Sequence, residues 1–297
     1  MRRLSQHLPE AAELKPASMW KAASLLLVMT ASATAAADPE LLARGEQIFN
    51  IGGCTNCHTA AGGQTLAGGA ALVTPFGTFH PPNITPDPTH GIGGWTQEQF
   101  NTAMREGRSP SGAPYYPAFP YTSHTRMSDD DLVALKAYLD GLPPSSSPSR
   151  GHELGFPFNQ RWGIRFWQWA FFTPGRFVPE ADRDDAWNRG AYLVLGPGHC
   201  AECHTPRNAL GVLDMDRAFA GGDLGGPNGK VPNITSSPDG IGSWSEGDLS
   251  MTLSLGMLPD GDFLGGEMGN VVSNGTAKLP PEDLAALVTY LKSLPPH

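Results

Sequence analysis

Two copies of one short motif constrain the fold of this chain more than any other feature. Cys-Thr-Asn-Cys-His occupies residues 54–58, and Cys-Ala-Glu-Cys-His occupies residues 200–204. The pattern Cys-x-x-Cys-His is the attachment signature of a c-type haem, because each thiol can add to one vinyl group of the porphyrin and the histidine can reach the iron. The motifs predict two covalently bound haem c groups, with these attachment and ligand residues: Cys54, Cys57, His58, Cys200, Cys203 and His204.

The cysteine count supports this interpretation. The chain has four cysteines, and the two motifs use all of them, so none is left for a disulfide. A redox-active dithiol or a four-cysteine zinc site are the other interpretations of such pairs. A thioredoxin-like pair needs a preceding strand, whereas glycine-rich residues 52–53 and 196–198 precede these motifs. A zinc site would require neither histidine, and haem attachment is therefore favoured.

The similarity between the two halves extends well beyond the cysteines. Pro-Asn-Ile-Thr begins at Pro82 and again at Pro232, and each copy is followed by Gly-Ile-Gly-x-Trp. The offset grows only from 146 residues at the haem histidines to 152 at the leucines that close each half. Such a repeat is the mark of duplicated structural units. It predicts two homologous domains, at residues 38–144 and 183–297, joined by a linker at 145–182.

Each domain is expected to be mainly α-helical. Residues 39–51 and 184–195 carry apolar side chains on one helical face, with Gly45 and Gly190 at points where small residues let two helices cross closely. Acidic start signals and a Pro-Pro stop delimit a closing helix in each half. The fold class that we predict is two tandem class I cytochrome c domains with long loops, each enclosing one covalently bound haem.

Residues 1–37 have the composition of a secretory signal peptide. Lys21 supplies a positive charge, residues 25–29 form a short apolar stretch, and small residues follow. A true start at Met19 is an alternative that the sequence leaves open. The apolar stretch is too short to span a bilayer. We expect export to the periplasm, where bacterial haem attachment takes place, with association at the outer face of the inner membrane as a further option.

Charge and aromatic content bear on the partners. Removing residues 1–37 takes four basic and two acidic residues from totals of 20 and 29, which leaves a formal charge of −11. An acidic chain argues against nucleic acid as a partner and is compatible with steering toward a basic protein. Three of the seven tryptophans lie in residues 156–172. Packing between the domains is one interpretation of this segment, and peripheral contact with a membrane or a partner subunit is the other.

The second axial ligand of each iron decides between electron transfer and catalysis, because a methionine raises the potential and closes the iron. In the second domain, Met268 lies among small residues before the closing helix and is the expected ligand. In the first domain, Met127 is favoured as the only methionine of the loop, with His124 or an open iron as alternatives. The other interpretation of Met127 is an apolar contact just before the helix cap at Ser128.

The chain resembles the multihaem cytochrome c subunits of membrane-associated alcohol, gluconate and related dehydrogenases. The resemblance covers both haem motifs, the Asn-Ile-Thr stretches, Phe-Pro-Phe-Asn at residues 156–159 and Thr-Pro-Arg after His204. Many members have Tyr-Pro-Ala-Met-Pro-Tyr in the first domain, which implies a methionine ligand, whereas this chain has Phe119 in that place. Members often carry three haems, and the two motifs here put the quinone-oxidising role of longer relatives in doubt.

We therefore expect a periplasmic dihaem cytochrome c that relays single electrons from a dehydrogenase to the respiratory chain and is not itself an enzyme. The expected donor is a periplasmic dehydrogenase, and the expected acceptor is a cytochrome, an oxidase or a quinone-linked protein. The alternative is a dihaem peroxidase or small-molecule oxidoreductase that uses an open iron in the first domain. Phe119 supports this alternative, with His124 and Arg126 as the distal groups.

Overall fold

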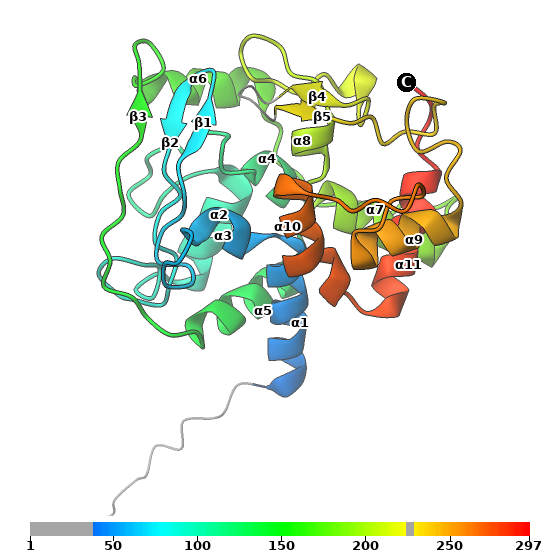
Figure 1. Cartoon of the computed structure of the whole chain (residues 1–297). Helices are drawn as coiled ribbons and strands as arrows, with labels where there is room; N and C mark the ends of the chain where they lie inside the picture. Colours follow the sequence, from blue (N-terminus) through cyan, green and yellow to red (C-terminus); the bar gives the residue numbers. More distant parts are fainter. Residues whose placement is uncertain (1–37, 224–228) are drawn as a thin grey trace, which may run out of the picture. The chain divides into compact units, whose positions relative to one another are not determined.

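The computed structural model describes residues 38–223 and 229–297, so the expected signal peptide lies outside the described residues. Regular structure here is mainly helical, with a few short strands (Figure 1). The first half contains α1 (Pro39–Ile51), α2 (Cys54–His58), β1 (Leu72–Thr74), β2 (Gly77–Phe79), α3 (Gln97–Glu106), α4 (Tyr121–His124), α5 (Asp129–Asp140), β3 (Glu153–Leu154) and α6 (Trp162–Phe171). The second half contains α7 (Asp185–Leu195), α8 (Ala201–His204), the 3-10 helix η1 (Met215–Arg217), β4 (Gly222–Asp223), β5 (Lys230–Val231), α9 (Glu246–Leu255), α10 (Gly266–Asn274), the 3-10 helix η2 (Thr276–Lys278) and α11 (Pro281–Lys292).

The order of helices repeats, as the sequence repeat predicts. Helices α1 to α5 correspond in order to α7 to α11, and each half contains a short helix at its Cys-x-x-Cys-His motif. The corresponding helices share their start signals. A capping box opens both α3 and α9, formed by Thr96 with Gln99 and by Ser245 with Asp248. The mainly helical prediction and the predicted first helix of each half are confirmed.

In each half the first helix crosses the closing helix at a glycine. A Cβ atom at Gly45 of α1 would lie 2.2 Å from the carbonyl oxygen of Ala134 in α5, and one at Gly190 of α7 would lie 2.0 Å from that of Ala286 in α11. Only glycine permits these approaches, because 2 Å is far inside van der Waals contact. Beside each crossing an arginine reaches a buried aspartate. The pairs are Arg44 Nε with Asp131 Oδ1 (2.5 Å) and Arg189 Nε with Asp283 Oδ1 (2.7 Å).

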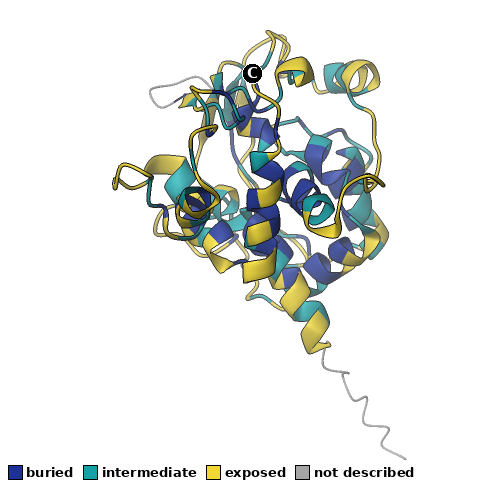
Figure 2. Cartoon of the chain, turned by 90° about the vertical axis from the view of Figure 1, so that its right-hand side faces the viewer, coloured by how far each residue is buried: buried dark blue, intermediate teal, exposed yellow. Residues whose placement is uncertain are grey.

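Buried side chains form two apolar clusters, one in each half. Figure 2 shows helices with one buried and one exposed side, the pattern expected for amphipathic helices around a core. The first cluster draws on α1, α3 and α5, and the second on α7, α9 and α11. Ile51, the last residue of α1, packs into the second cluster. The two halves are therefore joined by apolar packing as well as by the chain.

The serine-rich tract at residues 145–149, which resembles a hinge in the sequence, is bonded to the first half. Asn83 Nδ2 donates to the carbonyl oxygens of Ser145 (2.8 Å) and Ser147 (2.9 Å), and the Asn83 amide donates to Ser149 Oγ (3.1 Å). The chain then adds β3 to the antiparallel pair of β1 and β2 before it forms α6. In the part of the chain that the structure describes, no helix is long and apolar enough to cross a membrane.

Candidate haem sites

The two Cys-x-x-Cys-His motifs adopt nearly the same local structure. Residues 54–58 form α2, and Cys200 is the N-cap of α8. In a helical turn, residues three and four positions apart lie on the same face. The two cysteines and the histidine of each motif therefore share one side of the turn. This is the arrangement that attachment of a porphyrin by two thioether bonds and one axial nitrogen requires.

The histidines of both motifs are held in the same way by a prolyl carbonyl. His58 Nδ1 lies 2.7 Å from the carbonyl oxygen of Pro82, and His204 Nδ1 lies 2.8 Å from that of Pro232. A hydrogen bond from Nδ1–H fixes the tautomer and leaves Nε2 with a free lone pair, as in metal-ligating histidines generally. Loss of solvation lowers the pKa of both histidines. The neutral form that can bind a metal is therefore the one present at neutral pH.

In each half, the asparagine that follows the proline holds the loop of the prolyl carbonyl in place. We call the hydrogen bonds of this asparagine the asparagine clasp. Asn83 Oδ1 accepts hydrogen bonds from the amide (2.9 Å) and hydroxyl (2.8 Å) of Thr85, which is fully buried. Asn233 Oδ1 does the same with the amide (2.8 Å) and hydroxyl (2.7 Å) of Thr235. The sequence showed Pro-Asn-Ile-Thr as a repeat without a role. The structure assigns it one, because the prolines orient the histidines and the asparagines fix the prolines.

The second clasp also reaches the end of the chain. Asn233 Nδ2 donates to Ser237 Oγ (2.9 Å) and to the carbonyl oxygen of His297 (2.9 Å). The Asn83 amide group likewise bonds the segment that follows α5. Each clasp thus ties the loop beside its haem histidine to the residues after the closing helix.

The cysteine thiols fit haem attachment better than dithiol or zinc chemistry. All four are free, and desolvation raises the pKa of Cys54 and Cys200 to about 12. Reactive dithiols need the opposite, a pKa lowered toward neutrality. Within residues 38–223 and 229–297, no three His, Cys, Asp or Glu side chains gather where they could hold a metal ion. The two cysteine pairs therefore do not form the four-ligand cage expected of a structural zinc site.

The expected axial methionine of the second domain, Met268, lies at the edge of the second apolar cluster. Met268 is in the first turn of α10, is half-buried, and packs against the second apolar cluster. That cluster also contacts Cys200 of the second motif. The structure thus brings Met268 and the second attachment motif to one core.

The two candidate ligands of the first iron, Met127 and His124, lie in different surroundings. Met127 is fully buried in the first apolar cluster, which also contacts Cys54 and Phe119. His124 ends α4, and its ring packs edge-on against Phe119 (5.6 Å between centroids) and His199 (5.5 Å). Its Nδ1 is buried without a hydrogen-bond partner among the described residues. Loss of solvation holds the pKa of His124 well below its ordinary value.

The two attachment motifs lie next to each other across the junction of the halves. His199, which precedes Cys200, has its Nε2 3.3 Å from the carbonyl oxygen of Gly52, which lies two residues before Cys54. Asn274 Nδ2 of α10 donates to Asn56 Oδ1 of α2 (2.7 Å). The pKa of Cys203 is raised to about 11, mainly by desolvation, with a smaller contribution from Cys57 of the other motif. No pattern in the sequence predicts this proximity.

A second polar junction involves Glu202, which lies between the two cysteines of the second motif. Its carboxylate accepts hydrogen bonds from Thr122 Oγ1 (2.5 Å) and Ser123 Oγ (2.9 Å) of α4, and from Arg207 Nη2 (2.6 Å). Glu202 is buried, so these bonds offset the cost of removing its charge from water. The second attachment turn is thereby bonded to α4 of the first half.

These features define a protein built on two c-type haem sites, and comparison with known sequences agrees. The cytochrome c profile matches residues 42–143 and 179–295. The chain belongs to the cytochrome c family. The prediction of two haem c groups, one for each matched region, is confirmed.

The chain is similar to several curated proteins. It is 48% identical to a diheme cytochrome c-type protein of Cereibacter sphaeroides over 87% of this chain and 90% of that protein. It is 41% identical to the fructose dehydrogenase cytochrome subunit of Gluconobacter japonicus, over 86% of this chain and 52% of that subunit. It is 40% identical to the cytochrome c subunit of the quinone alcohol dehydrogenase of Gluconobacter oxydans, over 93% of this chain and 60% of that subunit. The chain thus spans little more than half the length of these two dehydrogenase subunits. The resemblance to such subunits is confirmed.

Proposed function

We propose that this protein is a periplasmic dihaem cytochrome c that accepts electrons from a dehydrogenase and passes them singly toward the respiratory chain. The observation that carries this proposal is the duplicated attachment turn with its clasped histidine. Haem c, when bound, supplies one-electron exchange at iron. The residues proposed to hold the haems are Cys54, Cys57, His58, Cys200, Cys203 and His204, with Met268 as the second ligand of the second iron.

The protein's own contribution is to hold and tune the two groups. The Pro82 and Pro232 carbonyls orient the histidines, and the apolar clusters would exclude water from a bound haem, which would raise its reduction potential. The contacts of His199 with Gly52 and of Asn274 with Asn56 keep the two attachment turns adjacent. Adjacent attachment turns favour electron transfer between the two haems of one chain over electron transfer between separate molecules. This supports a relay within one chain.

Flash reduction of the fully oxidised protein tests the relay. A photoreduced flavin delivers one electron, and absorption changes then follow its equilibration between the two haems. We expect a phase whose rate does not depend on protein concentration. A rate that rises in proportion to protein concentration would contradict a relay within the chain.

The donor is tested with catalytic subunits of the dehydrogenase types named among the relatives. The oxidised cytochrome is mixed with the catalytic subunit of a quinone alcohol, fructose or gluconate dehydrogenase and its substrate. Reduction of both haems is expected with at least one of them. If none reduces the protein while hydrogen peroxide rapidly oxidises the reduced form with turnover, the peroxidase alternative is favoured instead. Periplasmic location is tested by cell fractionation and by the N-terminal residue of the mature chain.

We further propose that α6 makes the peripheral membrane contact. One side of α6 is bonded to the body. Arg161 Nη1 donates to the Pro114 carbonyl (3.0 Å), and Trp167 Nε1 donates to that of Leu210 (2.9 Å). The other side presents Trp162, Phe166 and Trp169, at helical spacing, with exposed fractions of 65%, 64% and 85%.

The charge of this segment suits an anionic lipid surface. Residues 161–171 contain two arginines, Arg161 and Arg165, and no acidic residue, in a chain that is acidic as a whole. A helix with exposed tryptophan and phenylalanine beside arginine is typical of a peripheral helix that lies in the lipid headgroup region. The alternative that the aromatics only pin the domains together does not account for the exposed side.

Vesicle sedimentation tests this contact. The intact protein should sediment with phosphatidylglycerol vesicles, and the W162S/F166S/W169S variant should remain in the supernatant. The L255S/F263S variant is the control, because Leu255 and Phe263 are equally exposed (66% and 63%) outside α6. Equal losses in both variants, or no sedimentation of the intact protein, would rule out α6 as a membrane contact.

A further inference from the structure

The two candidate axial methionines do not occupy equivalent positions. Met127 immediately precedes Ser128, the N-cap of α5, and Leu279 immediately precedes Pro280, the N-cap of α11. Both residues are buried members of the apolar cluster of their own half. The repeat therefore matches Met127 with Leu279, a core residue that cannot bind iron. Met268 belongs to α10, whose counterpart in the first half is α4.

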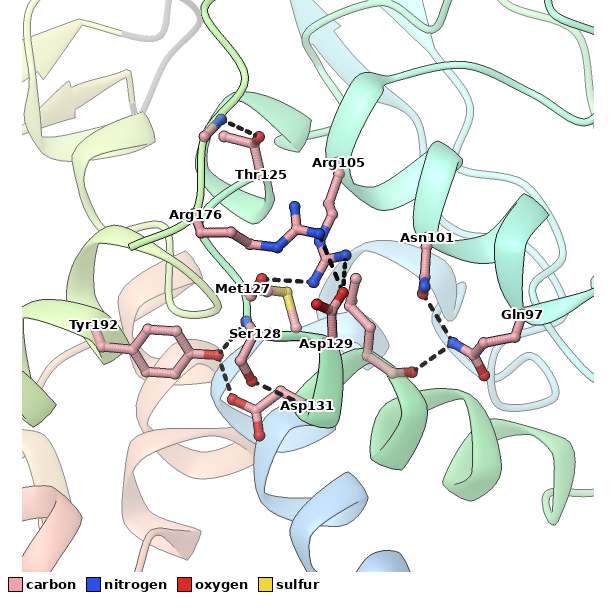
Figure 3. Close-up of polar contacts among 12 residues, drawn as sticks. Gln97, Asn101, Arg105, Thr125, Met127, Ser128, Asp129, Asp131, Arg176 and Tyr192 are labelled. Carbon is pink, nitrogen blue, oxygen red and sulfur yellow. Dashed lines mark hydrogen bonds and ion pairs between the residues drawn. The ribbon is translucent and has the colours of Figure 1, made fainter. Parts of the chain in front are cut away.

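The surroundings of Met127 are those of a packing residue. Its side chain is fully buried, and its carbonyl oxygen accepts a hydrogen bond from Arg105 Nη2 (2.9 Å). Figure 3 shows Arg105 and Arg176 converging on Asp129 beside it. On the other side, the hydroxyl of Tyr192 bonds the Ser128 amide and Asp131. This network fixes the backbone of Met127 at the start of α5, and the side chain itself is enclosed by the first apolar cluster.

The segment of the first half that corresponds to α10 offers no sulfur. Met268 lies eleven residues before Leu279, and the residue eleven before Met127 is Tyr116. The Tyr116 hydroxyl is already bonded to the Phe158 carbonyl (2.9 Å). Next to α4 lies Phe119, whose ring packs against the first apolar cluster and the ring of His124. A phenylalanine ring can occupy space at a haem but cannot bind its iron.

His124 is the remaining nitrogen in this segment, and it lacks the support that a ligand histidine has. The Nδ1 atoms of His58 and His204 are each bonded to a prolyl carbonyl. The Nδ1 of His124 has no partner among the described residues, although the residue is 94% buried. A ligating histidine normally has its second nitrogen oriented by such a bond. An unpartnered buried nitrogen is rare, and it is the kind of group that a small bound molecule satisfies.

We propose that the iron of the first haem has no methionine ligand and keeps an exchangeable sixth position that accepts a small neutral molecule, for which carbon monoxide is the probe. Phe119 and the ring of His124, which pack against each other, would line this position. This inference rests on the proposed attachment of a haem at Cys54, Cys57 and His58. The two domains would then differ in chemistry although they share a fold, with the second haem closed by Met268.

Carbon monoxide titration of the reduced protein tests this, with haem content measured separately as the pyridine haemochrome. We expect two haems in each chain and a single carbon monoxide bound, with one high-spin haem in the resonance Raman spectrum. The F119M variant places a sulfur beside α4. Both haems of this variant should be low-spin, and it should bind no carbon monoxide. The M268L variant should open the second iron and bind two molecules of carbon monoxide in each chain. The M127L variant should behave as the unchanged protein.

Each of the following results would overturn the proposal, and each would point to a different cause. If the unchanged protein binds no carbon monoxide and M127L gains a site, Met127 is the ligand. If H124L gains the site, His124 is the ligand. If no variant gains one, the first iron is closed by another group. A chain that holds fewer than two haems would instead contradict the attachment proposal, which separates the two failures.

Discussion

At the scale of single residues, the side chains that matter most at each haem site are those that position the histidine. Asn83 and Asn233 each use their side-chain oxygen for a buried threonine and their amide group for a distant segment. Asn83, Thr85 and Thr235 are buried and need their partners, because an unsatisfied buried donor or acceptor costs about 1–3 kcal/mol. The same residues that stabilise the loop therefore help to hold the histidine that we propose as the iron ligand.

The variants N83A and N233A should each affect one haem only. We expect each to lower the free energy of unfolding by about 1–3 kcal/mol and to shift the reduction potential of the haem in its own half, because the prolyl carbonyl is no longer fixed. Potentiometric titration followed by optical spectra measures the two potentials separately. A shift of both potentials in either variant would show that the clasp acts through the whole fold instead.

At the scale of elements, the two helix crossings set how close the first and closing helices can approach. Gly45 and Gly190 meet carbonyl oxygens of the opposite helix at distances that no Cβ atom tolerates. Glycine costs helical stability, about 1 kcal/mol relative to alanine, so its presence within α1 and α7 is offset by the packing it permits. The paired arginines and aspartates add charge-assisted hydrogen bonds at the same crossings.

The G190A variant should separate α7 from α11 and lower the free energy of unfolding by about 3 kcal/mol, the upper end of the usual cost of overpacking. Thermal unfolding followed by circular dichroism would report this as a lower Tm. The matched control is G163A in α6, where nothing lies within 4 Å of an added Cβ. This control should be neutral or stabilising by up to about 1 kcal/mol. A similar Tm for both variants would contradict the crossing argument.

At the scale of the whole described unit, polar contacts couple the halves close to the haem sites. Tyr192 of α7 donates its hydroxyl hydrogen to Asp131 of α5, and its oxygen accepts from the Ser128 amide (3.1 Å). Burial raises the pKa of Tyr192, so the hydroxyl remains a donor. Asp131 also accepts from Arg44, so one carboxylate joins the first helix of each half to the start of α5.

The Y192F variant should weaken this coupling. It leaves Asp131 and the Ser128 amide each without one partner, which costs about 1–3 kcal/mol, and it should let the halves unfold less cooperatively. Calorimetry can detect a broadened or split transition. Y138F is the control, because Tyr138 contacts Phe49 by its ring (5.1 Å between centroids) in the first half alone. A single sharp transition at an unchanged Tm in Y192F would refute the coupling.

The sequence by itself determined the parts that depend on local chemistry and on repetition. The motif spacing predicted both haem groups and their attachment residues, apolar periodicity predicted α1 and α7, and cap residues predicted the start of α5. These features can be predicted from sequence because each depends on residues that lie only a few positions apart. The role of Met268 and the export of the chain remain predictions of the same kind.

Only the tertiary structure could assign functions that arise from residues distant in sequence. The bond between His204 and Pro232 spans 28 residues, and that between Asn56 and Asn274 spans 218. The tertiary structure also shows that Met127 is fully buried just before the N-cap of α5, whereas Met268 is half-buried in the first turn of α10. Aromatic content alone could not show that one side of α6 is bonded and the other exposed. These properties depend on which surfaces the fold brings together, and a local pattern of residues does not predict such contacts.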